Sequence, residues 1–278
     1  MLGERISEDI VGLAARTPTL PPATHTNSYA LGSREVLLVE PATPYEDERA
    51  QWVAWVRGLV AQGRTPLALV LTHHHADHVG GADFLARELE LPIWAHEATA
   101  ARLPELAVAR RLRDGETLLL DGPRIQQWRV LHTPGHAPGH VCLFETQSKT
   151  VIVGDMVASV GTILIEPGDG DMREYLAQLQ RLADLDASTA LPAHGAPIHG
   201  PSALFRHYVT HRLMREGKVL AALERGPLDV EALLPLVYDD TPQSIWPLAR
   251  LSLLAHLDKL LAEGRVVLHD AAYALNDD

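Results

Sequence analysis

Short apolar runs bounded by turn residues recur along the first two thirds of the chain and predict β-strands. Such runs are typical of strands that are buried in a sheet. They span residues 27–32, 35–40, 67–71, 91–95, 116–120, 125–131 and 150–154. Between these runs, apolar residues recur at helical spacing in 46–62, 83–90 and 172–183. This part of the chain is therefore expected to contain both sheet and helix.

The pattern changes at Pro201, after which the chain is expected to be mainly helical. The elements expected there are helices at 203–224, 228–236 and 245–263 and short strands at 264–270 and 272–275. Three helices followed by a two-stranded wing indicate a winged-helix-like module. We therefore predict a first domain of residues 1–200 and a C-terminal domain of residues 201–278.

Two local features complete the expected secondary structure. Asp83 stands where the helix at 83–90 begins, and its carboxylate is expected to cap that helix. Arg110 to Arg113 form the densest basic run, which is expected to be an exposed loop face.

The composition is that of an ordinary globular protein, with 278 residues, 46% hydrophobic and 22% charged. The formal net charge of −12 argues against a general affinity for nucleic acid or anionic membrane, because both require clustered Lys and Arg. Cys142 is the only cysteine, so no intrachain disulfide is possible. The N-terminus is acidic and no run approaches a membrane span, so the cytoplasm is the expected compartment.

Histidines and one aspartate follow directly after the apolar run at 67–71. His73 and His75 alternate along an extended loop, so their two rings can reach one ion, and Asp77 and His78 can turn to a second ion. Imidazole and carboxylate are donors that Zn²⁺ accepts. A polyhistidine tag would lie at a terminus, whereas this cluster is internal. The cluster therefore indicates a metal site at the end of a strand.

The same arrangement recurs at other predicted strand ends further along the chain. His136 and His140 follow the run at 125–131, Asp155 follows the run at 150–154, and His194 follows an apolar segment at 190–193. A random distribution of 15 histidines would not place ligand-type residues at one strand end after another. We expect these strand ends to converge on one rim.

The spacing His73-x-His75-x-Asp77-His78 resembles the signature of the metallo-β-lactamase superfamily, and Thr133-Pro134-Gly135-His136 resembles its next motif. The stretch from Tyr208 to Glu216 is similar to the lactamase-β-2-like subfamily. The resemblance implies an α/β fold, an αββα sandwich of two mixed sheets with helices outside, followed by the small winged-helix-like module. It also implies two Zn²⁺ ions, although Fe and Mn tolerate the same donors. The ligands that it implies are His73, His75 and His136 for the first ion, Asp77, His78 and His194 for the second, and Asp155 shared.

A dinuclear site of this kind predicts a hydrolase. Bound Zn²⁺ lowers the pKa of its water from about 15.7 to about 7, so a bridging hydroxide can attack an acyl or phosphoryl centre. Asp77 is expected to act in catalysis as well as in metal binding. His140, four residues after His136, is expected either to support a ligand or to donate a proton.

Three functions remain open on the sequence. The acidic charge favours hydrolysis of a small-molecule acyl substrate, which would be a thioester, a lactone or a related ester or amide. Cleavage of single-stranded RNA is the alternative, with Arg212 and Arg215 on one helix face to hold phosphates, although the same pair suits the anionic end of an acyl carrier. The third and weakest possibility is a non-enzymatic winged-helix protein that binds nucleic acid and contains structural zinc. It is the weakest because a structural zinc site is closed by four protein ligands, whereas this chain offers seven ligand-type residues.

Overall fold

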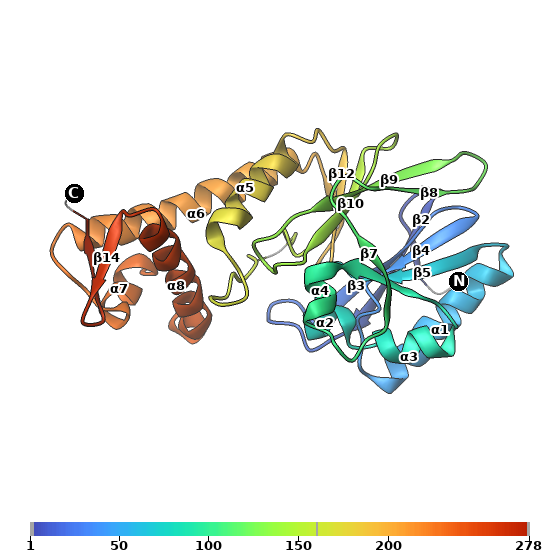
Figure 1. Cartoon of the computed structure of the whole chain (residues 1–278), viewed down its shortest axis with the longest axis horizontal. Coiled ribbons are helices and arrows are strands. Elements are labelled where there is room, and N and C mark those ends of the chain that lie inside the picture. Colours follow the sequence, from blue (N-terminus) through green and yellow to red (C-terminus); the bar gives the residue numbers. More distant parts are fainter. Residues whose placement is uncertain (1–2, 160, 277–278) are drawn as a thin grey trace. The chain divides into compact units, whose positions relative to one another are not determined.

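The computed structural model describes residues 3–159 and 161–276, and their contacts form two compact units (Figure 1). The first unit contains the residues up to Thr133, Pro138–Gly161 and Asp186–Pro201. The second contains Pro134–Ala137, Thr162–Leu185 and the residues from Ser202 onward. Among the described residues, no helix is both long enough and apolar enough to cross a membrane.

The first unit contains a mixed seven-stranded sheet in which the strands follow their sequence order. β1 to β4 are antiparallel, whereas β4 to β7 run parallel to one another. The strands are β1 (Glu4–Arg5), β2 (Ile10–Arg16), β3 (His25–Leu31), β4 (Glu35–Val39), β5 (Thr65–Val70), β6 (Ile93–His96) and β7 (Val108–Leu112). The helices between them are α1 (Glu46–Ala61), α2 (Ala76–Val79), α3 (Ala82–Glu88) and α4 (Glu97–Ala101).

A second, six-stranded sheet in the same unit has the order β13-β12-β11-β10-β9-β8. Its strands are β8 (Thr117–Leu120), β9 (Gln126–His132), β10 (Val141–Glu145), β11 (Thr150–Gly154), β12 (Thr189–Pro192) and β13 (Ile198–His199). β11 and β12 are parallel and the other pairs are antiparallel. The carboxyl ends of β11 and β12 therefore lie at the same edge of this sheet.

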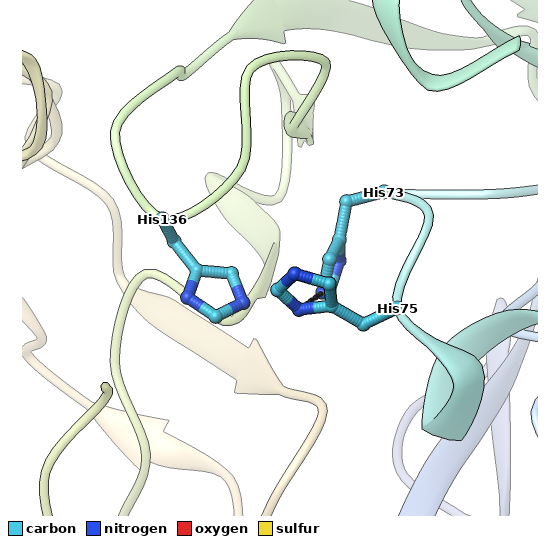
Figure 2. A group of neighbouring side chains, drawn as sticks. All are labelled: His73, His75 and His136. Carbon is cyan, nitrogen blue, oxygen red and sulfur yellow. Dashed lines mark hydrogen bonds between the residues drawn. The ribbon is translucent and has the colours of Figure 1, made fainter. Parts of the chain in front are cut away.

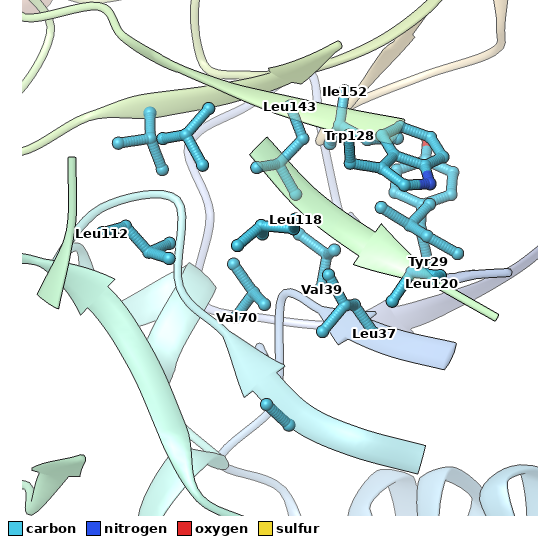
Figure 3. Packing of buried hydrophobic residues seen from close by; sticks show 14 of the residues in the cluster. Tyr29, Leu37, Val39, Val70, Leu112, Leu118, Leu120, Trp128, Leu143 and Ile152 are labelled. Carbon is cyan, nitrogen blue, oxygen red and sulfur yellow. The ribbon is translucent and has the colours of Figure 1, made fainter. Parts of the chain in front are cut away.

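The two sheets pack face to face around a buried apolar layer (Figure 3). Leu37, Val39 and Val70 come from the first sheet, and Trp128 and Leu143 come from the second. A separate core lies between the other face of the first sheet and the helices α1 and α3, which contribute Trp52, Trp55 and Leu85 among others. The expected sandwich of two mixed sheets is confirmed.

The second unit is mainly helical. It contains α5 (Met172–Ala183), α6 (Ser202–Leu223), α7 (Val230–Val237), a short 3₁₀ helix η1 (Gln243–Ile245), α8 (Trp246–Ala262), and the hairpin β14 (Val266–His269) and β15 (Ala272–Leu275). Buried residues of α6, α7, α8 and the hairpin form one core, with Val219, Leu233, Leu253 and Leu257 at its centre. The expected winged-helix-like module is confirmed.

Most predicted elements are found within one or two residues of their expected bounds, and α5 matches at both ends. The cap predicted at Asp83 is wrong, because Gly81 precedes α3 and the Asp83 carboxylate instead pairs with Arg87 at 2.5 Å. The run from Arg110 to Arg113 is not a loop, because β7 extends through Leu112 at the edge of the sheet. The strand β2 was not predicted, since Gly12 and two alanines weaken its apolar pattern.

Candidate metal centre

The first group of ligand-type residues is His73, His75 and His136. Their nearest ring nitrogens lie within 4.8 Å of one another, and the three rings point toward one another in Figure 2. His73 and His75 follow β5, and His75 is the residue immediately before α2. Nε2 of His73 lies 3.0 Å from Nδ1 of His75. The structure therefore brings together the three imidazoles that the sequence suggested for one ion.

The second group is Asp77, His78 and His194, whose ligand atoms also lie within 4.8 Å of one another. Asp155 follows the end of β11, and each of its oxygens faces one of these imidazoles. Oδ2 lies 3.5 Å from Nε2 of His78, and Oδ1 lies 3.4 Å from Nε2 of His194. Asp155 thus lies between two ligand-type histidines, one in α2, which follows β5 of the first sheet, and one in the loop after β12 of the second sheet.

Four of the imidazoles are oriented by hydrogen bonds from Nδ1 to an oxygen acceptor. The donor and acceptor pairs are His73 to Thr72 Oγ1 at 2.9 Å, His78 to Glu40 Oε1 at 3.1 Å, His136 to the Leu164 carbonyl at 2.9 Å, and His194 to the His25 carbonyl at 3.0 Å. A proton on Nδ1 leaves the Nε2 lone pair as the ring's available donor atom. This bonding pattern is typical of histidines that bind a metal through Nε2.

The electrostatics of the second group favour a bound cation. Burial alone would lower the pKa of His78, but the carboxylates of Asp155, Glu40 and Asp77 raise it well above its ordinary value. Burial alone would raise the pKa of Asp155, but His78 and His194 hold it well below its ordinary value. Nε2 of His78 is buried and makes no hydrogen bond within the described residues. Nitrogen and carboxylate donors with this surplus of negative charge suit a divalent metal ion.

Glu40 also belongs to the centre, and sequence reasoning missed it. It follows β4 with a φ of 60° and is fully buried. Its Oε1 accepts hydrogen bonds from Thr72 Oγ1 at 2.5 Å and from His78 Nδ1 at 3.1 Å. Since Thr72 in turn accepts from His73, one carboxylate orients a histidine of each group. A charged residue at the end of an apolar run was the available signal, the same one that identified Asp155.

Replacing Glu40 with glutamine is expected to weaken metal binding about 10–100-fold, the usual effect of losing a partner behind a ligating histidine. The substitution keeps the shape but removes the negative charge that accepts from Thr72 and His78. Metal affinity is measured by competition with a chelator of known affinity. Glu35→Gln on the same strand is the control, because Glu35 instead bonds the backbone N–H of Asp121. Equal affinities in the two variants would contradict this role.

His140 is fully buried beside Asp155. Its Nε2 accepts the backbone N–H of Asp155 at 3.1 Å, and its Nδ1 lies 2.8 Å from Thr133 Oγ1. An Nε2 that accepts a hydrogen bond carries no proton, so the ring's proton is on Nδ1 and is directed toward Thr133. Of the two roles expected for His140, this geometry favours the support of Asp155 over proton donation.

Replacing His140 with leucine is expected to lower the free energy of unfolding by about 1–3 kcal/mol, because the buried N–H of Asp155 loses its acceptor. Turnover is expected to fall as well, since the Asp155 backbone is no longer held. Urea denaturation and steady-state kinetics provide the two measurements. His199→Leu on the exposed strand β13 is the control. A variant with parent stability but an altered pH profile would instead support proton donation.

Arg212 and Arg215 are not on an exposed surface. Their side chains are buried within the second unit, with relative exposures of 2% and 7%, and they bond to residues of that unit. Buried, internally bonded guanidinium groups do not form a track for phosphates. The expected contact of these two arginines with substrate is therefore not what the structure shows.

Comparison with known proteins agrees with this fold. The model of the metallo-beta-lactamase superfamily matches residues 21–194, and that of the beta-lactamase associated winged helix domain matches residues 230–273. The beta-lactamase-like protein 2 homolog of Drosophila melanogaster is 27% identical over 277 residues, which cover 94% of this chain and 91% of the relative. The atrochrysone carboxyl ACP thioesterase of Aspergillus chevalieri is 28% identical over 255 residues, which cover 87% of this chain and 77% of the relative.

A solved structure extends the likeness over both units. The crystal structure of a metallo-beta-lactamase family protein from Thermus thermophilus superposes with a TM-score of 0.80 at 25% identity. The superposition covers 98% of this chain and 100% of that one.

Proposed function

Because this chain belongs to the metallo-beta-lactamase superfamily, we propose that it hydrolyses a small acyl substrate, such as a thioester or lactone, with two zinc ions. The family and the fold make it a metal-dependent hydrolase. The proposal adds the number and identity of the ions and the class of substrate. A relative named as a thioesterase supports the acyl class.

In this proposal His73, His75 and His136 hold one ion, Asp77, His78 and His194 hold the other, and Asp155 is shared between them. When bound, zinc supplies Lewis acidity, which lowers the pKa of water to about 7 and polarises a carbonyl group. The other roles in the site belong to residues of the chain. Glu40 and Thr72 orient two ligands, and His140 holds the backbone of Asp155. The Asp77 side chain is 17% exposed, and in this proposal it would also accept a proton from the attacking water.

The observation that carries the acyl class is a largely apolar depression next to His194. It has a volume of about 480 Å³ and is lined by Ala14, Pro22, Ala23, Thr24, Asn27 and His194 among others. Among the described residues that line it, none is Lys, Arg, Asp or Glu. An apolar wall with a few polar groups suits a neutral acyl chain, whereas a polynucleotide requires cationic groups along its backbone.

The loop that carries His194 is tied to β3, which also lines the depression. The backbone N–H of Asn27 donates to the Ala193 carbonyl at 2.7 Å, and the Asn27 side chain donates to the Gly195 carbonyl at 2.8 Å. Tyr29 donates from its hydroxyl to the Pro192 carbonyl at 2.8 Å. The depression and one ligand-type histidine are therefore held by the same strand.

The test is hydrolysis of a substrate panel by the zinc-loaded protein, combined with elemental analysis. We expect two equivalents of zinc per chain and hydrolysis of acyl-coenzyme A, acyl-pantetheine or lactone substrates in preference to single-stranded RNA. Ala23→Asp, which adds a charge to the depression, is expected to raise KM for the acyl substrate. Ala50→Asp on the exposed surface of α1 is the control. Cleavage of RNA with every acyl substrate inert would overturn the acyl class, and one zinc per chain would overturn the dinuclear site.

A further inference from the structure

Two arginines on consecutive turns of α6 are buried in the second unit but contact different segments of it. Burying a guanidinium is costly unless its donors are satisfied, so the partners of each arginine indicate what it holds in place. Arg215 donates to the Val237 carbonyl at 2.7 Å and to Asp240 Oδ1 at 2.7 Å. Its partners thus lie at and just after the end of α7.

Arg212 holds a different segment, which joins the two units in sequence. Its Nη2 donates to Thr162 Oγ1 at 3.0 Å and also to the Ile163 carbonyl. Its guanidinium also lies over the ring of Tyr175 in α5, 5.7 Å from the ring centroid. Arg212 therefore contacts both the segment at 162–163 and the first turns of α5.

Both of the segments that Arg212 contacts adjoin the turn Pro134–Ala137, which carries His136. The residue after Ile163 is Leu164, whose carbonyl accepts the hydrogen bond from Nδ1 of His136 at 2.9 Å. Residues 162–166 belong to no helix or strand, so no ladder of hydrogen bonds fixes that carbonyl. On the other side, Gly135 packs so closely on Tyr175 that an added Cβ would lie 2.2 Å from the Tyr175 nitrogen.

We propose that Arg212 is a positioning residue for His136. By holding Thr162 and Ile163, Arg212 fixes the Leu164 carbonyl, which keeps the proton of His136 on Nδ1 and leaves Nε2 as the donor atom of the ring. The expected effect on metal binding rests on the proposed metal site. The link from Arg212 to the His136 tautomer does not, because it is argued from contacts within the second unit. This role links Arg212 to the metal centre without requiring any contact between Arg212 and substrate.

The experiment compares Arg212→Met with Arg215→Met, because both remove a buried guanidinium from the same helix and only the first touches the 162–163 segment. Titration with Co²⁺ alone, followed by its visible absorption, is expected to show about 10–100-fold weaker binding of one equivalent in Arg212→Met. Arg215→Met is expected to bind both equivalents as the parent does. Parent affinity in Arg212→Met, or the same loss in both variants, overturns the proposal.

A second readout does not depend on metal. Long-range ¹H–¹⁵N NMR of the histidine rings in the metal-free protein reports which nitrogen carries the proton, with His136 assigned by comparison with His136→Gln. We expect the Nδ1–H form in the parent and a mixture in Arg212→Met, or in Arg212→Lys if the methionine variant does not fold. An unchanged tautomer overturns the proposal. If the parent protein shows the Nδ1–H form of His136 but binds only one metal ion, that result counts against the proposed function and not against the role of Arg212.

Discussion

Replacing Asp155 with alanine is expected to reduce hydrolysis more than about 100-fold, since even residues that only support a metal ligand are worth 10–100-fold. Asp155 is 7% exposed and faces His78 and His194 with its two oxygens at 3.5 and 3.4 Å. In the proposed dinuclear site, removal of its negative charge would leave two cations facing each other with no carboxylate between them. Turnover and zinc content of the purified variant are the measurements.

Two further variants separate the charge of Asp155 from its shape. Asp155→Asn keeps the size of the side chain and is expected to be almost as inactive as the alanine variant, because it lacks the charge. Asp83→Ala removes an exposed carboxylate that pairs with Arg87, and turnover in this control is expected to equal that of the parent. If Asp155→Ala turns over substrate at nearly the parent rate, Asp155 is not a shared ligand.

Replacing Gly135 with alanine is expected to disrupt the turn that carries His136 and to destabilise the protein. Gly135 has a φ of +129°, which an L-residue rarely adopts, and the added Cβ would lie 2.2 and 2.3 Å from backbone atoms of Tyr175. The backbone conformation alone costs about 1–3 kcal/mol, and the clash cannot be relieved by a side-chain rotation. Urea denaturation is expected to show the loss of stability, and zinc titration the loss of one equivalent.

Gly58→Ala is the matched control, with an effect of opposite sign. Gly58 lies inside α1, where an added Cβ meets nothing within 4 Å. Alanine is favoured over glycine in a helix by about 1 kcal/mol, so this variant is expected to be more stable than the parent and to bind zinc equally. Parent-like stability and zinc binding in Gly135→Ala would show that the turn can move without affecting His136.

The sequence alone determined the sandwich and the C-terminal module, and it suggested the seven residues that are proposed as metal ligands. Each strand is a run of apolar residues that is local in sequence, and ligand-type residues follow directly where a run ends, as His73 and Asp155 do. Features of this local kind can be predicted from sequence as elements, although the cap expected at Asp83 shows that a boundary can still be misplaced.

Only the tertiary structure decided how those residues are supported. Glu40 stands 38 residues before His78 along the chain, and Arg212 stands 49 residues after Ile163, so no spacing rule connects them. The sequence suggested that Arg212 binds substrate because Arg212 and Arg215 stand three residues apart on one helix face, but the partners of Arg212 lie inside its own unit. Burial and long-range hydrogen bonds arise only when the chain packs. The packed structure therefore decides which polar side chain supports a ligand and which one is exposed to solvent.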